Sequence, residues 1–248
     1  MVELSNSSQI SGFLTLIAII ILIPLLIIVL KRAIETKEKI LYLFFFTFIF
    51  SFSPWYPTGF GYIYWIFTHE TLSYDFNILA GMAFTPIGII AWINIYLRTV
   101  KPNFRTSIII VFTIFSCIFE VYLFYYLYFA PGAPIKSLLG TVNELRTNFL
   151  GFILIYALIS VIIVCSFGIH FSIISIKEAT SNKIRWKGKF LLAGFSFFTI
   201  VLILDTILPS SLIIGIIIIR IMLIFTCFFL YLGFILPNWI KKLLKIKE

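Results

Sequence analysis

Seven apolar stretches, each about 20 residues long and separated by short polar clusters, dominate this sequence. A helix needs about 17–25 apolar residues to cross the hydrocarbon core of a bilayer. Lipid cannot hydrogen-bond to a free backbone, so such stretches must be helical. We predict an all-α membrane protein, a bundle of seven transmembrane helices that makes up residues 1–236. The helices are expected near residues 12–30, 40–62, 77–97, 106–129, 149–174, 189–208 and 211–236.

The composition supports this class. Of the 248 residues, 61% are hydrophobic and 12% are charged, whereas an ordinary soluble domain is about 45–50% apolar and about 25% charged. A soluble enzyme, a disordered chain and a disulfide scaffold are therefore excluded. The first apolar run has Glu3 before it and Lys31 and Arg32 after it, the reverse of a signal peptide, so we expect it to be retained as a helix.

Basic residues are divided unequally between the two sides of the predicted membrane. Sixteen of the 19 Lys and Arg residues follow expected helices 1, 3 and 5 or lie in the tail, whereas the opposite side has only Lys136 and Arg146. The remaining one, Arg220, lies inside expected helix 7. The positive-inside rule then predicts a multi-pass protein of the cell membrane with its N-terminus outside and its C-terminus in the cytoplasm. The net charge of +9 indicates affinity for anionic inner-leaflet lipid, with no need for a nucleic-acid partner.

The tail, residues 237–248, is expected to form a short amphipathic helix along the inner membrane surface. One face would carry Trp239 and Ile240 and the other Lys241 and Lys242. We expect no soluble domain after Glu248, so any cytoplasmic output would pass through a separate signalling protein. The long basic loop from Ser175 to Lys189 is the predicted docking surface, although a loop that merely faces lipid is an alternative. Its docking residues would be Lys183, Arg185, Trp186 and Lys187.

Three ionisable residues lie within the predicted spans: Glu120, Asp205 and Arg220. A charge in a spanning helix costs about 2.5–3.5 kcal/mol on insertion scales, so each needs a partner or a function. Glu120 and Arg220 lie about ten and about nine residues below the same surface, at 1.5 Å per residue. This matched depth predicts a Glu120–Arg220 ion pair, while Asp205 could also reach Arg220 or face water. The network could be a fixed strut, a ligand-sensitive switch or three unrelated residues.

Expected helix 2 is interrupted by the segment from Ser53 to Gly61, where prolines remove backbone donors and glycines relax the helix. Irregular backbone at membrane depth is tolerated only where protein buries it or water reaches it. We therefore predict that the segment forms the wall of an outward-facing pocket. The alternative is an aromatic interface belt around an ordinary proline kink. The pocket residues would be Pro54, Trp55, Tyr56, Pro57, Gly59 and Gly61.

No motif indicates catalysis, a metal or a cofactor. The three cysteines, Cys117, Cys165 and Cys227, lie in apolar stretches without a close pair. The cluster of His69, Glu70 and Asp75 matches no strong ligand spacing. We expect that the protein is not an enzyme and has neither a metal nor a cofactor.

The exit from expected helix 7 carries a family resemblance. The run Leu230-Tyr231-Leu232-Gly233-Phe234-Ile235-Leu236-Pro237-Asn238-Trp239-Ile240-Lys241 resembles the helix 7 exit of the seven-helix sensor regions that precede histidine kinases in prokaryotic, particularly archaeal, proteins. The resemblance implies a membrane-embedded receptor or sensor. A small transporter of the three-one-three helix type and a structural membrane subunit remain alternatives. The transporter should show matching proline-interrupted helices in both halves, but prolines inside the expected helices fall in helices 1 to 3.

Overall fold

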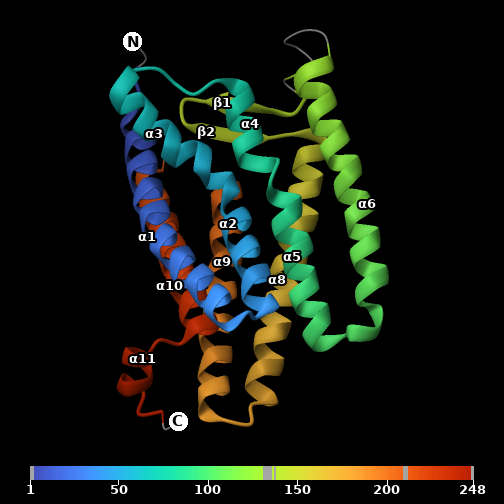
Figure 1. The fold of residues 1–248 in the computed structure, drawn as a ribbon. Helices are drawn as coiled ribbons and strands as arrows, with labels where there is room; N and C mark the ends of the chain where they lie inside the picture. The colour runs from blue at the N-terminus through green and yellow to red at the C-terminus, as the bar shows by residue number, and fades with distance from the viewer. Residues whose placement is uncertain (1–2, 131–135, 137, 209–211, 247–248) are drawn as a thin grey trace.

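The computed structural model describes residues 3–130, 136, 138–208 and 212–246. Seven long apolar spans run through the described part, as the sequence predicts, and a short helix follows the last span (Figure 1). The elements are α1 (Asn6–Thr36), α2 (Lys39–Ser51), η1 (Ser53–Trp55), α3 (Tyr56–Thr68), α4 (Tyr74–Met82), α5 (Thr85–Val100), η2 (Pro102–Phe104), α6 (Arg105–Phe124), η3 (Tyr125–Phe129), β1 (Gly140–Asn143), β2 (Arg146–Phe149), α8 (Gly151–Lys177), α9 (Asn182–Ile207), α10 (Ile213–Ile235) and α11 (Asn238–Leu243).

Three of the spans are composite. The second consists of α2, η1 and α3, the third of α4 and α5, and the fourth of η2, α6 and the π-helical turn η3. The strands, α3 and α4 lie at the end of the bundle that holds the N-terminus, and α11 lies at the other end (Figure 1). We call these the N-terminal end and the C-terminal end.

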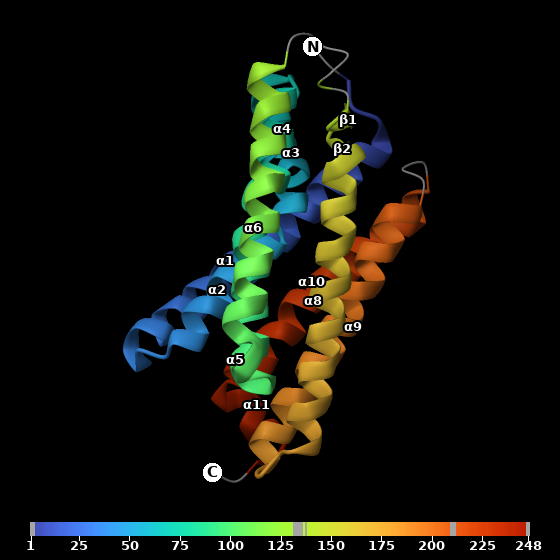
Figure 2. The ribbon, with the colours of Figure 1, turned by 90° about the vertical axis from the view of Figure 1, so that its right-hand side faces the viewer.

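The neighbours of each helix are set by packing. α9 packs along both α10 and α8, and α1 packs against α10, α2 and α3. α6 stands at one edge of the bundle beside α5 and α8. Figure 1 shows it on the opposite side of the bundle from α1 and α10, and Figure 2 views the bundle from the α6 side. Its outer face exposes apolar side chains, as a helix facing lipid should. These include Ile110, Val111, Ile114, Ile118 and Val121.

The second and third spans are broken at facing positions. The departure from regular helix predicted after Ser53 is confirmed for Ser53–Trp55, which form a 3-10 turn, but α3 is helical from Tyr56 onward. The Tyr56 hydroxyl donates to the carbonyl oxygen of Ile49 across this break. The Ser53 hydroxyl lies 3.0 Å from the carbonyl oxygen of Gly81, at the end of α4. Protein groups therefore satisfy backbone oxygens at both breaks, where lipid could not.

The fifth and sixth spans are joined more tightly than predicted. α8 continues to Lys177 and α9 begins at Asn182, with the Ser181 hydroxyl accepting from the backbone N–H of Ile184. The predicted basic loop from Ser175 to Lys189 is therefore wrong. Hydropathy marks where apolar residues end, whereas backbone hydrogen bonds carry the helix on through polar residues as far as its cap.

A two-stranded hairpin at the N-terminal end was not predicted. β1 and β2 pair antiparallel, with Gly140 opposite Phe149 and Asn143 opposite Arg146. Glu144, in the turn, has a left-handed φ of 54°. Strands of four residues have too little alternation of apolar and polar side chains for a sequence pattern to reveal them.

Candidate functional site

A partly buried ion pair joins the last two spans near the N-terminal end. The Arg220 Nη1 of α10 lies 3.1 Å from Oδ2 of Asp205, near the end of α9. The Arg220 side chain is 6% exposed and that of Asp205 is 26% exposed. Arginine stays protonated at any pH a protein tolerates, so this position always holds a charge that requires a partner. The sequence analysis gave a contact between Asp205 and Arg220 as an alternative to the predicted Glu120–Arg220 pair.

Two further side chains complete the site. Trp55 Nε1 donates to the same Asp205 oxygen at 2.9 Å, and Arg220 Nη2 lies 3.3 Å from Ser11 Oγ. Trp55 comes from the break in the second span and Ser11 from α1. We call Asp205, Arg220, Trp55 and Ser11 the polar node. The node therefore connects the first, second, sixth and seventh spans.

The hairpin contacts the node from the N-terminal end. The Arg146 guanidinium of β2 donates to the carbonyl oxygens of Asp205 and Leu208, the latter at 3.4 Å. These oxygens belong to the end of α9, where helical carbonyls lack partners and the helix dipole favours a cation. One residue, Asp205, therefore binds the hairpin through its backbone and the bundle through its side chain.

Glu120 does not join this network. In the part of the chain that the structure describes, Arg220 forms its ion pair with Asp205, and no ion pair includes Glu120. Glu120 lies on α6, which packs against α5 and α8, whereas Arg220 lies on α10, which packs against α9 and α1. The predicted Glu120–Arg220 pair is therefore wrong. Equal depth places two residues at one level of the membrane, but only the order of the helices decides whether they meet.

The segment predicted to form an outward pocket is largely packed against protein. Thr58 Oγ1 donates at 3.0 Å to the carbonyl oxygen of Leu145 in the hairpin turn. A Cβ on Gly59 would lie only 2.4 Å from Ile19 Cδ1 of α1, and one on Gly61 would lie 3.2 Å from a Leu145 methyl group. The hairpin and α1 therefore occupy the space at these two glycines where a recess was expected.

Of the other four predicted pocket residues, two are buried and two are half-buried. Trp55 is 4% exposed and is bonded to Asp205, so it belongs neither to an open pocket nor to an interface belt. Pro57 is buried, whereas Pro54 and Tyr56 are half-buried.

The predicted docking residues lie on the first turns of α9. Lys187 Nζ donates to the carbonyl oxygen of Phe234 at 2.7 Å, and Arg32 Nη1 of α1 lies 3.3 Å from that of Ile235. Both cations thus cap the end of α10. Lys189 Nζ lies 4.4 Å from the centre of the Trp186 ring. Arg185 is exposed, and Lys183 is half-buried.

A second polar contact holds the hairpin turn to α1. Glu144 Oε2 accepts from the Ser5 hydroxyl at 2.8 Å and from the Ser5 backbone N–H at 3.2 Å. Burial by itself would raise the pKa of Glu144, but hydrogen bonds from Ser8 and Ser5 outweigh it and hold the pKa below its usual value. The carboxylate also lies at the beginning of α1, where the helix dipole favours a negative charge.

The described residues contain no group of three or more His, Cys, Asp or Glu side chains that could hold a metal ion. Sequence reasoning missed Arg146, Ser11 and the bonding of Trp55 as parts of the node. The available signal was that Arg146 is one of only two basic residues on its predicted side. The other, Lys136, is also paired, with its Nζ 2.9 Å from Asp75 Oδ1.

Comparisons with known proteins add no relative. No protein-family model matches the chain, and neither the curated proteins nor the solved structures contain a match.

We expect the node to show strong coupling between Asp205 and Arg220. Asp205→Asn should leave a buried guanidinium without its counter-charge and reduce the free energy of unfolding by up to about 3–5 kcal/mol. Adding Arg220→Gln to that variant should restore part of the loss. Unfolding in mixed detergent micelles measures the cycle, and Glu120→Gln combined with Arg220→Gln is the matched control, expected to be additive. Additivity of Asp205→Asn and Arg220→Gln would contradict the pairing.

We expect the Glu144 contact to depend on pH. Because its pKa is lowered in the folded protein, the stabilisation is complete above the unfolded value of about 4.3 and is lost as the pH falls through the folded value. The melting temperatures of the wild type and Glu144→Gln should therefore differ at pH 6–7 and converge below about pH 4. A difference that stays constant over this range would show that the carboxylate charge is not what holds Ser5.

Proposed function

We propose that this seven-span helical membrane protein is a receptor or sensor that passes a signal to a separate cytoplasmic protein. The observation that carries the proposal is the double role of Asp205, which accepts from Arg146 of the hairpin and from Arg220 within the bundle. A stimulus that moves the hairpin would act directly on the end of α9. Switching proteins commonly work through such a local change in charge contacts that biases a pair of packed elements.

The proposed route follows α9 and α10, which pack together along their length. Charged contacts join these helices at both ends: Asp205 with Arg220 near the N-terminal end, and Lys187 with the Phe234 carbonyl near the C-terminal end. A shift of one helix along the other would alter both contacts. The cations at the start of α9 are the proposed docking surface for the cytoplasmic partner and for anionic inner-leaflet lipid. The resemblance of the segment from Leu230 to Lys241 to sensor regions agrees with this assignment.

The proposal requires that the N-terminal end lies outside the cell and the C-terminal end in the cytoplasm. The excess of basic residues at the first, third and fifth connections and in the tail supports this orientation. A reporter that is active only in the cytoplasm should give a signal when fused after Glu248 and none when inserted beside Lys136. The opposite pattern would reverse the orientation and remove the proposed route of the signal.

Coupling between the two ends can be measured with matched variants. Arg146→Gln removes the cation at the end of α9, whereas Lys136→Gln removes a cation of the same end that pairs with Asp75 of α4. With spin labels at Arg185 on α9 and Trp239 on α11, Arg146→Gln should shift the distance distribution in lipid nanodiscs, and Lys136→Gln should leave it unchanged. If both variants leave the distribution unchanged, the node is a fixed strut and the protein is better described as a structural subunit.

A further inference from the structure

Glu120 on α6 is a charged residue for which the described part of the bundle supplies no partner. It forms neither an ion pair nor a hydrogen bond with any described residue, and it is half-buried. Ser116, one turn earlier on the same helix, is by contrast bonded to the Tyr156 hydroxyl of α8 at 2.9 Å. An ionisable side chain within a span is costly without a partner and usually marks a functional position.

The cations of this chain are not available to Glu120. Arg220 is the basic residue that the sequence places well inside a span, and its partner is Asp205 at 3.1 Å. Arg105 shares α6 with Glu120, but it lies about 22 Å away along the helix and donates to Asn94 Oδ1 at 2.8 Å. The other basic residues belong to the connections, the helix ends and the tail.

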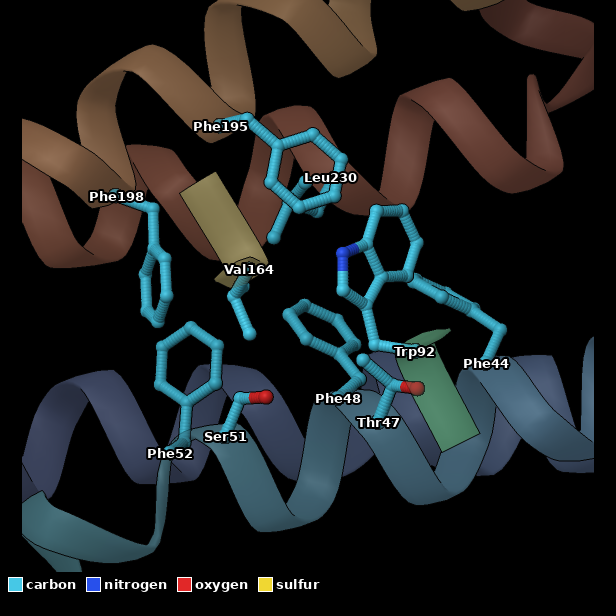
Figure 3. A pocket seen from close by; sticks show the side chains of 10 residues that line it. All are labelled: Phe44, Thr47, Phe48, Ser51, Phe52, Trp92, Val164, Phe195, Phe198 and Leu230. Atoms are coloured by element: carbon cyan, nitrogen blue, oxygen red, sulfur yellow. The ribbon is translucent and has the colours of Figure 1, made fainter. Parts of the chain in front are cut away.

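Two hollows in the structure are unrelated to Glu120. The first, inside the bundle, has a volume of about 20 Å³ and is lined by the ten uncharged residues that Figure 3 shows. The second, of about 280 Å³, lies between α9 and α10 and is lined by apolar side chains. Neither lining includes Glu120 or a cation. Because Glu120 is partly exposed, its partner can approach from the membrane.

α6 is the span with the most open surface. In its most apolar stretch 17% of the residues are buried, whereas the other six spans have 33–56%. Figure 2, which views the bundle from this side, shows α6 along its whole length. A further spanning helix can therefore pack beside α6 without displacing any helix of the bundle.

Polar side chains form one row along this open surface. Thr106, Thr113 and Glu120 are spaced seven residues apart, and Cys117 lies beside them, all within about 60° of arc on the helix. The two threonines and the cysteine are exposed. We call these four residues the α6 polar row. A seven-residue spacing is typical of the contact face of paired helices, and in membranes such faces are rich in small and polar side chains.

We propose that the α6 polar row is the docking surface for a spanning helix of a partner membrane protein, which presents a lysine or arginine at the depth of Glu120. The cation would pair with the carboxylate, and the small side chains of Thr113 and Cys117 would let the two helices approach closely. Cationic lipid headgroups cannot take this place, because Glu120 lies about 14 Å below the end of its span at Phe129.

A second copy of this chain does not fit the same requirement. Its Arg220 is 5% exposed and already bound to Asp205 and Ser11, so pairing with Glu120 would break the polar node. The partner is therefore a different protein. This inference concerns the outer surface of α6 and does not depend on the proposed function, whose cytoplasmic partner docks on α9.

The test uses synthetic spanning peptides of leucine and alanine that carry one central lysine or, in the matched peptide, glutamine. Energy transfer from a fluorescent protein fused after Glu248 to a dye on the peptide measures binding in phosphatidylcholine vesicles. The lysine peptide should bind the wild type about tenfold more strongly than the glutamine peptide. Glu120→Gln should abolish this preference, and Glu70→Gln, which removes an exposed carboxylate, should retain it. No preference in the wild type, or an unchanged one in Glu120→Gln, would overturn the proposal.

A second pair of variants tests the docking surface and leaves the charge of Glu120 in place. Thr113→Phe adds bulk within the row and should weaken binding of the lysine peptide several-fold. Ile114→Phe adds bulk at a residue that is 56% exposed on the same helix but lies outside the row, and it should leave binding unchanged. If both substitutions weaken binding equally, or if neither does, the partner helix does not use the α6 polar row.

Discussion

The permanent charge of Arg220 is the constraint on which the N-terminal half of the bundle depends. A guanidinium in the hydrocarbon region cannot shed its proton and cannot be left without a counter-charge. Asp205 of α9 supplies the counter-charge and Ser11 of α1 a hydrogen-bond partner. Asp205 in turn accepts from Trp55 in the broken second span. Four spans that would otherwise pack through interchangeable apolar side chains therefore acquire one defined arrangement.

Backbone groups released at helix breaks impose a second constraint. The second and third spans break at facing positions, so the Ser53 hydroxyl reaches both the Gly81 carbonyl and the Thr85 hydroxyl. A single break in lipid would leave polar atoms unsatisfied, whereas two adjacent breaks can satisfy one another. Irregular backbone and polar side chains are thus concentrated in one part of the bundle.

The two ends of the molecule carry different kinds of polar contact. At the N-terminal end, specific pairs hold the hairpin and its flanking chain to the spans, including Arg146 on the end of α9, Lys136 on Asp75 and Glu144 on Ser5. At the C-terminal end, cations of α1 and α9 cap the carbonyls of α10. The end held by these specific pairs is joined to the basic end by α9 and α10, and the proposed receptor function uses this arrangement.

The sequence by itself determined the seven spans and the short final helix. Lipid requires each spanning segment to satisfy its own backbone as a helix, and the length of each apolar run can be read from neighbouring residues alone. It also located the break at Pro54, since proline removes a donor wherever it stands. Only the tertiary structure decided that Arg220 meets Asp205 and not Glu120: depth follows from counting residues, but helix order follows from packing distributed over the whole chain. The hairpin contacts escaped prediction for the same reason, because Arg146 and Asp205 are far apart in sequence and meet only once α9 has its place.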